Sequence, residues 1–521
     1  MKLSVLRSNG HHSRIAGKTQ CRLTSGREGD IIGTGTGGGT VARRDSDMTV
    51  GNIWLHTVRF AIPMAIGLLF QQLYNTVDTL VVGQFVGQQA QAAVGSTGPI
   101  INTVVGFCAG LATGASVVIS QRYGAHDPEG LGKAVHTTVA VTFLLSLIAT
   151  AVGQLIIHPM LRFMQTPEDV FAESSRYLSI YFAGVTGILF YNIGSGILRA
   201  VGDSRRPLFF LILSAMLNIV LDLLFVLGFG MGVDGVAYAT IMSQILSAAL
   251  ILVTLTRERG GYGIRWRMLR IDRESLKIIL RLGLPTSIQS AITSFSNVFV
   301  QSYINAFGSA CMAGYGVYGK IDAFALIPVQ SISMSSTTFV GQNWGARQPG
   351  RAREGVRVAT VMSLISTVVL GALVFIAARP LMAVFSPVPE VIDYGVRFIH
   401  IVTPFYVTIC FNQIYSGALR GIGDATMPTV IMLLSVVVFR QIYLAVTKAL
   451  GAGFLAVALA YPVGWILCST LLVLRYLRSD LVRKSAMQPE TQLISMEERN
   501  EGNPRNSGIF TGFAPGGSRR R

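Results

Sequence analysis

The sequence predicts an all-α integral membrane protein, with twelve transmembrane helices in two parallel-repeat lobes of six around a central cavity. Three observations predict this fold class: an apolar composition, apolar runs long enough to cross a bilayer, and motifs that recur in both halves. Of the 521 residues, 51% are apolar and 13% are charged, whereas soluble domains carry roughly 25% charged residues. The charged residues lie in short islands between the apolar runs.

The apolar runs are each about 18–30 residues long, and a helix needs about 20 residues to cross the hydrocarbon core. We therefore expect one membrane span for each run. The expected spans are 53–82, 93–119, 135–157, 175–198, 208–228, 236–255, 278–304, 311–340, 356–378, 395–418, 428–447 and 453–476.

Basic residues gather on alternate connections between these spans. The connections 83–92, 229–235 and 305–310 contain no Lys or Arg, whereas the 256–277 linker contains seven. Because cytoplasmic loops are enriched in Lys and Arg, both termini and the linker are predicted to be cytoplasmic. This asymmetry and the basic tails account for the net charge of +17, and no aromatic-basic module indicates a nucleic-acid partner.

The ends of the chain differ from the rest in composition, which predicts five regions. A basic N-terminal extension and a polar C-terminal tail are expected to be disordered, and translation starting at Met48 is left open. The regions are the extension 1–47, an N-lobe 48–255, the cytoplasmic linker 256–277, a C-lobe 278–478 and the tail 479–521.

Two motifs recur in the halves at one offset. SQRYGA at 120–125 returns as GQNWGA at 341–346, and SGILRAVGDSRRP at 195–207 returns as SGALRGIGDATMP at 416–428, each 221 residues later. Six spans per half return the chain to the same side, so the repeats are parallel. Such repeats are typical of transporters with a central site between two rocking lobes.

These paired QxxGA and LRxxGDxxxP motifs resemble the multidrug and toxic compound extrusion (MATE) family, as do VDTLVVGQ at 77–84 and NIVLD…GVxGxAxAT at 218–240. The resemblance covers about residues 50–478. It implies a monomeric antiporter, and no enzyme, in a prokaryotic cytoplasmic membrane and in contact with its lipid. Such an antiporter exports bulky, often cationic, drug-like small molecules in exchange for H⁺ or Na⁺, with no other cofactor.

Three carboxylates lie deep within the predicted spans: Asp78, Asp222 and Asp322. A charge at the centre of a membrane helix costs roughly 2.5–3.5 kcal/mol on insertion scales, so each is a candidate for function. The alternative for each is a structural bond to another polar group. Metal-dependent membrane enzymes need clustered acids, and no such cluster occurs here.

Asn218 precedes Asp222 by four residues, which places both on one helix face. Counting along the spans puts Asp78, Asp222 and Thr240 within about 6–9 Å of the outer membrane boundary. Carboxylate, amide and hydroxyl oxygens suit Na⁺ or a shared proton. We predict that these four residues form the cation-coupling site, a possible Na⁺ site, and they match the family's cation site.

The second half lacks this set: Val300, Phe439, Tyr443 and Tyr461 stand at the equivalent positions of Asp78, Asn218, Asp222 and Thr240. A purely structural role does not explain why only one lobe keeps these polar groups. The acids that some family members carry in the seventh and tenth helices are also absent here, so we do not expect a second sodium site.

Other polar residues in the spans can line the central cavity or form interhelical hydrogen bonds. Lys320 and Asp322 can either form charge pairs with other helices or take a role in the cavity. Arg440 is expected to meet a buried carbonyl or acid. The candidates for lining the cavity are Gln71, Tyr74, Asn192, Gln289, Asp322 and Gln413. A rival function is a flippase for lipid-linked saccharides, although few basic residues lie deep enough to bind phosphate.

Overall fold

The structure, a computed structural model, describes residues 47–164 and 166–487, which belong to one compact unit and are helical without a strand in this part of the chain. Of the regions predicted to be disordered, residues 1–46 and 488–521 lie outside these residues, whereas 480–487 are helical, so the disordered tail was predicted to begin too early. The first lobe consists of α2 (Ile53–Val81) with a π-helical turn η1 (Val82–Val86), α3 (Gln88–Gly124), α4 (Pro128–Phe163), α5 (Glu168–Ala183), α6 (Val185–Ala200), α7 (Arg205–Leu223) with a second π-helical turn η2 (Leu224–Gly228), and α8 (Gly232–Arg257).

The second lobe follows a linker that contains one short 3₁₀ turn, η3 (Trp266–Met268). Its helices are α9 (Arg273–Asn305), α10 (Ser309–Ala325), α11 (Ile327–Gly345), α12 (Pro349–Ile376), α13 (Ala378–Phe385), α14 (Pro389–Val402), η4 (Thr403–Phe405), α15 (Tyr406–Gly421), α16 (Thr426–Met432), the π-helical turn η5 (Leu433–Phe439), α17 (Arg440–Ala449), α18 (Phe454–Ala458) and α19 (Ala460–Leu477).

The predicted membrane fold is confirmed. Within the described residues, nine helical segments are long and apolar enough to cross a membrane, and eleven when two bent pairs each count as one span. The bends are 50° between α5 and α6 and 42° between α10 and α11. Helix α9 has 33 residues but is too polar for the same test. Counting it gives the twelve predicted helices.

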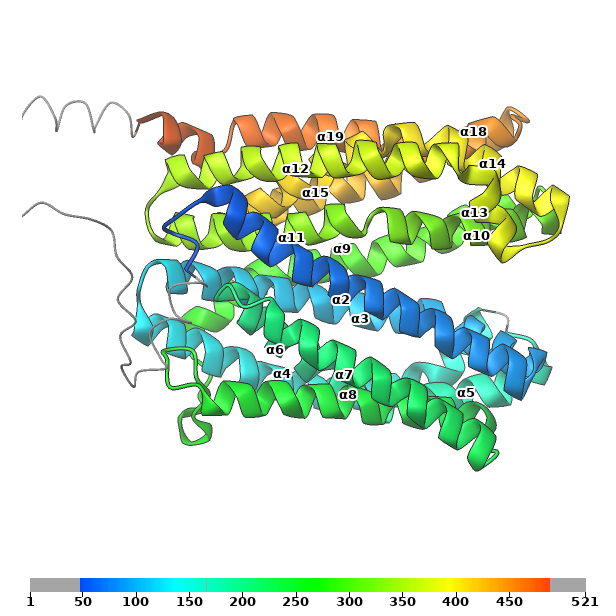
Figure 1. Cartoon of the computed structure of the whole chain (residues 1–521), viewed down its shortest axis with the longest axis horizontal. Helices are drawn as coiled ribbons and strands as arrows, with labels where there is room; N and C mark the ends of the chain where they lie inside the picture. Colours follow the sequence, from blue (N-terminus) through cyan, green and yellow to red (C-terminus); the bar gives the residue numbers. More distant parts are fainter. Residues whose placement is uncertain (1–46, 165, 488–521) are drawn as a thin grey trace, which may run out of the picture. The chain divides into compact units, whose positions relative to one another are not determined.

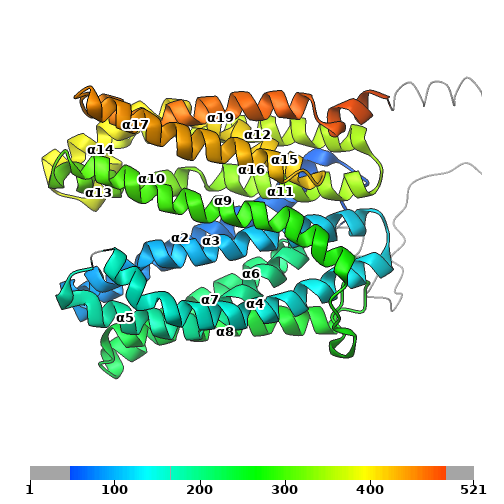
Figure 2. The same cartoon turned by 180° about the vertical axis from the view of Figure 1, so that it is seen from behind.

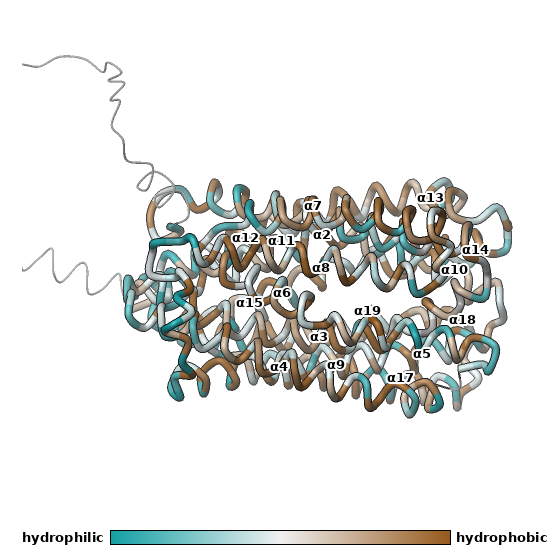
Figure 3. The backbone as a smooth tube through the Cα atoms, turned by 90° about the horizontal axis from the view of Figure 1, so that it is seen from below, coloured by the Kyte–Doolittle hydropathy of each residue, from teal (hydrophilic) through white to brown (hydrophobic). Residues whose placement is uncertain are grey.

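The two lobes lie side by side with α2, α3 and α9 between them (Figures 1 and 2). We call the end of the bundle that carries Asp47 and Met487 the terminal end. The linker also lies there, because the Arg265 N–H donates to His136 (3.1 Å) and the Asp272 N–H donates to Thr137 (3.0 Å), near the start of α4. Most of the hydrophilic residues lie at the two ends of the bundle (Figure 3).

Helices α3 and α9 hold the lobes together at close range. A Cβ atom at Gly110 would lie 2.4 Å from Ser287, and one at Gly114 would lie 2.4 Å from Gly283. The Ser287 hydroxyl donates to the carbonyl of Phe107 at 2.7 Å. Only glycine allows two helix backbones to approach this closely, as at packed interfaces between membrane helices.

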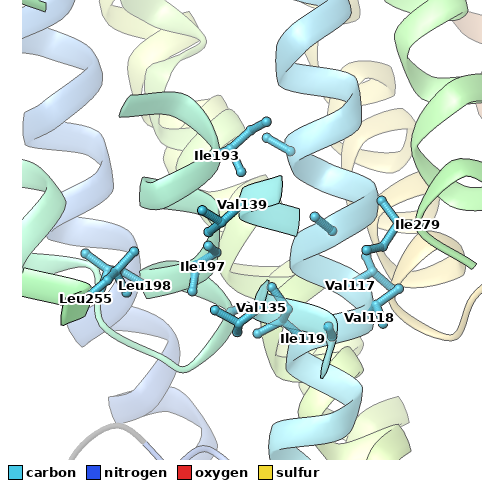
Figure 4. Packing of buried hydrophobic residues seen from close by; sticks show 14 of the residues in the cluster. Val117, Val118, Ile119, Val135, Val139, Ile193, Ile197, Leu198, Leu255 and Ile279 are labelled. Carbon is cyan, nitrogen blue, oxygen red and sulfur yellow. The ribbon is translucent and has the colours of Figure 1, made fainter. Parts of the chain in front are cut away.

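Nearer the terminal end, Ile279 of α9 packs beside Val117 and Val118 of α3 in a cluster that belongs mainly to the first lobe (Figure 4). At the other end of the bundle the corresponding surfaces are uncovered. A Cβ atom would meet nothing within 4 Å at four glycines of α3 and α10, which are Gly95, Gly98, Gly316 and Gly319. The lobes therefore pack together towards the terminal end and leave surface open towards the opposite end.

Candidate functional site

Two acidic side chains meet inside the first lobe, away from the terminal end. Asp78 lies near the end of α2, Asp222 lies near the end of α7, and their carboxyl groups interact directly. Asp222 is fully buried, and among the described residues no donor reaches either of its oxygens or Oδ1 of Asp78. Two carboxyl groups can bond to each other only by sharing a proton. The pair therefore needs a proton or a cation.

Asn218 and Thr240 complete the predicted set. Asn218 lies one turn before Asp222 on α7 and is buried, and both polar atoms of its amide lack a partner among the described residues. The Thr240 hydroxyl of α8 donates to the Val236 carbonyl at 3.0 Å. Tyr177 of α5 lies beside Thr240. An unpartnered buried amide is costly, so a ligand that occupies its oxygen and nitrogen is favoured.

Two tyrosines lie close to the acidic pair, and a third stacks on one of them. Tyr74, predicted to line the cavity, lies on α2 one turn before Asp78 and close to both carboxylates. Tyr177 of α5 also lies close to both, and Tyr181 stacks beside it with ring centroids 6.4 Å apart. Sequence reasoning missed Tyr177 and Tyr181, because two tyrosines four residues apart on a helix look like ordinary core residues.

Both carboxylates are followed by a π-helical turn, which sequence reasoning also missed. The turn η1 (Val82–Val86) begins four residues after Asp78, and η2 (Leu224–Gly228) begins two residues after Asp222. Such turns are rare and occur frequently at functional sites. They widen the helix locally and change the direction in which the preceding side chains point. No residue pattern in either segment indicates them.

The remaining cavity candidates do not join this site. Asn192 donates to the carbonyl of Ile188 on its own helix at 2.8 Å, while Gln71 and Gln413 are half-buried. Gln289 makes interhelical hydrogen bonds, the alternative to lining the cavity. It is buried inside the second lobe, where it accepts from Thr429 at 3.2 Å and donates to the sulfur of Met432 at 3.1 Å. It therefore ties α9 to α16.

Asp322 of α10 is held by neutral groups. Its Oδ1 accepts from Tyr406 at 2.5 Å and from Tyr318 at 3.2 Å. Lys320 is exposed and lies over the ring of Phe385, with 5.8 Å from Nζ to the centroid. The structure thus separates these two neighbours in sequence and gives Asp322 phenol partners in place of a charge pair.

Arg440 lies on α17 and was expected to meet a buried carbonyl or acid. Its guanidinium donates to the Ser296 hydroxyl and to the Asn297 side-chain carbonyl, both at 2.9 Å, and lies 5.1 Å from the centre of the Tyr461 ring. The Asn297 side chain supplies a carbonyl, one of the two kinds of partner expected, and these partners are neutral side chains. Tyr461 occupies the place in the second lobe that Thr240 occupies in the first, so this lobe holds a fixed positive charge there.

The comparisons with known proteins agree with this architecture. The MatE family model matches residues 63–224 and 285–447. The chain belongs to the MATE family. The two matched segments begin 222 residues apart, which confirms the repeat that the paired motifs predict.

Two proteins of Bacillus subtilis are similar to the chain over most of its length. The chain is 31% identical over 393 residues to the probable multidrug resistance protein YoeA of Bacillus subtilis, which covers 74% of this chain and 85% of that one. It is 27% identical to YpnP of the same organism, over 82% of this chain and 96% of that one. Neither name supports the saccharide flippase left open above.

A solved structure of a multidrug resistance MATE family transporter in an outward-facing conformation superimposes with a TM-score of 0.80. The two chains are 26% identical, and the alignment covers 85% of this chain and 98% of that one. This MATE family chain is therefore a multi-pass membrane transporter of the multidrug efflux class.

Proposed function

We propose that this MATE protein is a secondary active antiporter that exports bulky, often cationic organic compounds in exchange for H⁺ or Na⁺. The observation that carries the proposal is the contact between Asp78 and Asp222, whose oxygens lack donors beside the unpartnered amide of Asn218. With Thr240, these groups offer the oxygen ligands that hard cations prefer. One proton shared between the carboxylates also satisfies them.

The site joins α2, α7 and α8, so binding an ion there favours whichever arrangement of the first lobe brings these helices together. A ligand moves a conformational equilibrium only as far as its affinities for the two states differ. Exchange follows when the ion and the drug favour different states of the same lobe. The tyrosines and the apolar side chains beside the pair exclude water, which strengthens the electrostatic coupling.

The proposal is tested with the purified wild-type protein in liposomes loaded with a fluorescent organic cation. A pH gradient and a sodium gradient are imposed separately, each with the membrane potential clamped. We expect one of the two to drive the dye against its own concentration gradient, and an ionophore that collapses that gradient to stop transport. Dye movement that ignores both gradients would contradict antiport.

We also propose that the terminal end faces the cytoplasm, because the arginines of the linker lie there. Arg267→Cys and Val388→Cys each place one exposed thiol, the first in the linker and the second at the opposite end. In a background without the five native cysteines, an impermeant maleimide added to intact cells is expected to label position 388 within minutes. Position 267 should react only after lysis, and the reverse pattern would invert the topology.

A further inference from the structure

The duplicated LRxxGDxxxP motif builds the same helix ending in each lobe. Helix α6 ends in a turn where Gly202 takes a φ of 90° and the N–H of Asp203 donates to the Leu198 carbonyl at 2.9 Å. Oδ1 of Asp203 then accepts from the backbone N–H of Arg206, in the first turn of α7. This αL glycine ending satisfies the carbonyls of Leu198 and Arg199, since the Gly202 N–H donates to the latter at 2.9 Å.

The second copy repeats this turn at the end of α15. Gly423 takes a φ of 95°, the N–H of Asp424 donates to the Leu419 carbonyl at 2.9 Å, and Asp424 accepts from the N–H of Met427 at 3.3 Å. The carbonyls at the two helix ends, Ala200 and Gly421, therefore occupy equivalent positions in the two lobes.

Each of these carbonyls accepts a hydrogen bond from the opposite lobe. Nε2 of Gln121, on α3 of the first lobe, donates to the Gly421 carbonyl at 2.7 Å. Nε2 of Gln342, on α11 of the second lobe, donates to the Ala200 carbonyl at 2.9 Å. Both donors and both acceptors are separated by the repeat offset of 221 residues, so the two bonds are the same interaction made twice.

The glutamines stand within the closest backbone contact between the lobes. A Cβ atom at Gly124 would lie 1.9 Å from the Gln342 carbonyl oxygen, and one at Gly345 would lie 2.0 Å from that of Gln121. Gln342 is fully buried, and its Oε1 accepts from the Met48 N–H at 3.0 Å. Gln121 is half-buried and lines a hollow of about 650 Å³ at the terminal end.

We propose that Gln121 and Gln342 form a reciprocal latch that holds the terminal end shut, and that both bonds break when this end opens during transport. Each bond crosses from one lobe to the other, so neither survives if the lobes separate there. The carbonyls are helix C-terminal groups, which carry partial negative charge. Amide donors suit them without adding the desolvation cost of a charged side chain. The part of this proposal that concerns transport rests on the antiport function proposed above.

The test measures the separation of the lobes directly. Glu129→Cys and Glu354→Cys place spin labels on exposed positions of α4 and α12, one in each lobe at the terminal end, in a background without the native cysteines. Pulsed electron resonance then gives the distance distribution for protein in nanodiscs, without ion gradient or drug. We expect one short distance in the protein with both glutamines.

Gln121→Glu and Gln342→Glu are the decisive variants, because glutamate keeps the shape of the side chain and loses the N–H donor. We expect a longer distance to gain population, with the open-to-closed ratio rising about fivefold for each donor lost, the ratio that one net hydrogen bond implies. The open-to-closed ratio should be higher in the double variant than in either single variant. Gln121→Ala is the fallback if the buried position 342 does not tolerate a charge.

Gln154→Ala is the matched control. Gln154 donates to the Ser179 carbonyl at 2.7 Å, so this variant also loses a glutamine-to-carbonyl bond, but within the first lobe. Its distance distribution should be that of the parent. An unchanged distribution in folded Gln121→Glu and Gln121→Ala would overturn the latch, as would an equal shift in Gln154→Ala. Because the measurement needs no transport, failure of the antiport proposal would leave this result intact.

Discussion

Replacing Asp222 by Asn is expected to reduce gradient-driven drug transport to the level of empty liposomes, while the protein still inserts and folds. Asparagine has nearly the volume of aspartate, but its amide neither ionises nor takes up a proton at physiological pH. The fully buried position has no donor to lose. Removing a charge from the apolar interior therefore costs no stability. The ion then no longer binds the two conformations of the lobe with different affinities, so ion movement is no longer coupled to drug transport.

Asp78→Asn should have the same effect, and the two changes together should be no worse than either alone, because the carboxylates act on one bound ion. Asp234→Asn is the matched control: it is the same substitution in the same lobe, at a partly exposed ion pair with Arg176 of 3.6 Å. Such pairs contribute roughly 0–1 kcal/mol, so transport should persist. Full transport by the Asp78→Asn, Asp222→Asn double variant would refute the site.

A second large effect is expected from adding one methyl group where the lobes touch. Gly124→Ala would place Cβ 1.9 Å from the backbone carbonyl oxygen of Gln342, and Gly345→Ala repeats this clash at 2.0 Å from Gln121. A backbone carbonyl cannot move aside as a flexible side chain does. Overpacking of this kind typically costs about 1–3 kcal/mol. Here the lobes can relieve it by separating, so the terminal end should stay open and transport should fall at least tenfold.

The measurement for these variants is drug efflux from cells together with the label distance between positions 129 and 354. Gly132→Ala is the control, because that helical glycine of α4 meets its nearest neighbour at 3.7 Å, an ordinary contact. It should transport normally. Wild-type efflux and wild-type distances in Gly124→Ala would show that the backbone contact does not determine closure of the terminal end.

The sequence predicted the helices well, because the membrane demands long apolar runs and the repeat supplies an independent copy of each. It also predicted one site of Asp78, Asn218, Asp222 and Thr240, since few polar groups occur at that depth. The two carboxyl groups do interact, and the role of the four residues stays a prediction. The break at Gly184 between α5 and α6 was not predictable. A single glycine in a membrane helix has many packing roles, and the bend depends on what packs against it.

Polar residues between the lobes were harder to assign. Gln121, Gln289 and Gln342 are the same residue type in similar apolar surroundings, yet Gln289 binds inside its own lobe and the other two bind across to the opposite lobe. Only the partner distinguishes these cases, and the partner is set by the packing of distant helices. The π-helical turns beside Asp78 and Asp222 were unpredictable for the same reason.

The reciprocity of the two bonds at the terminal end has a consequence for how such a chain arose. In a twofold-symmetric homodimer, a contact from one copy to its mate is always matched by the reverse contact. A half-length ancestor carrying one glutamine and one helix ending would have made both bonds at once by pairing with itself. The acidic site needs no second copy, since all its residues lie in one lobe. Fusion of two genes would keep the shared interface and free one duplicate to lose the acids, which leaves Val300 and Tyr443 where the other half has Asp78 and Asp222.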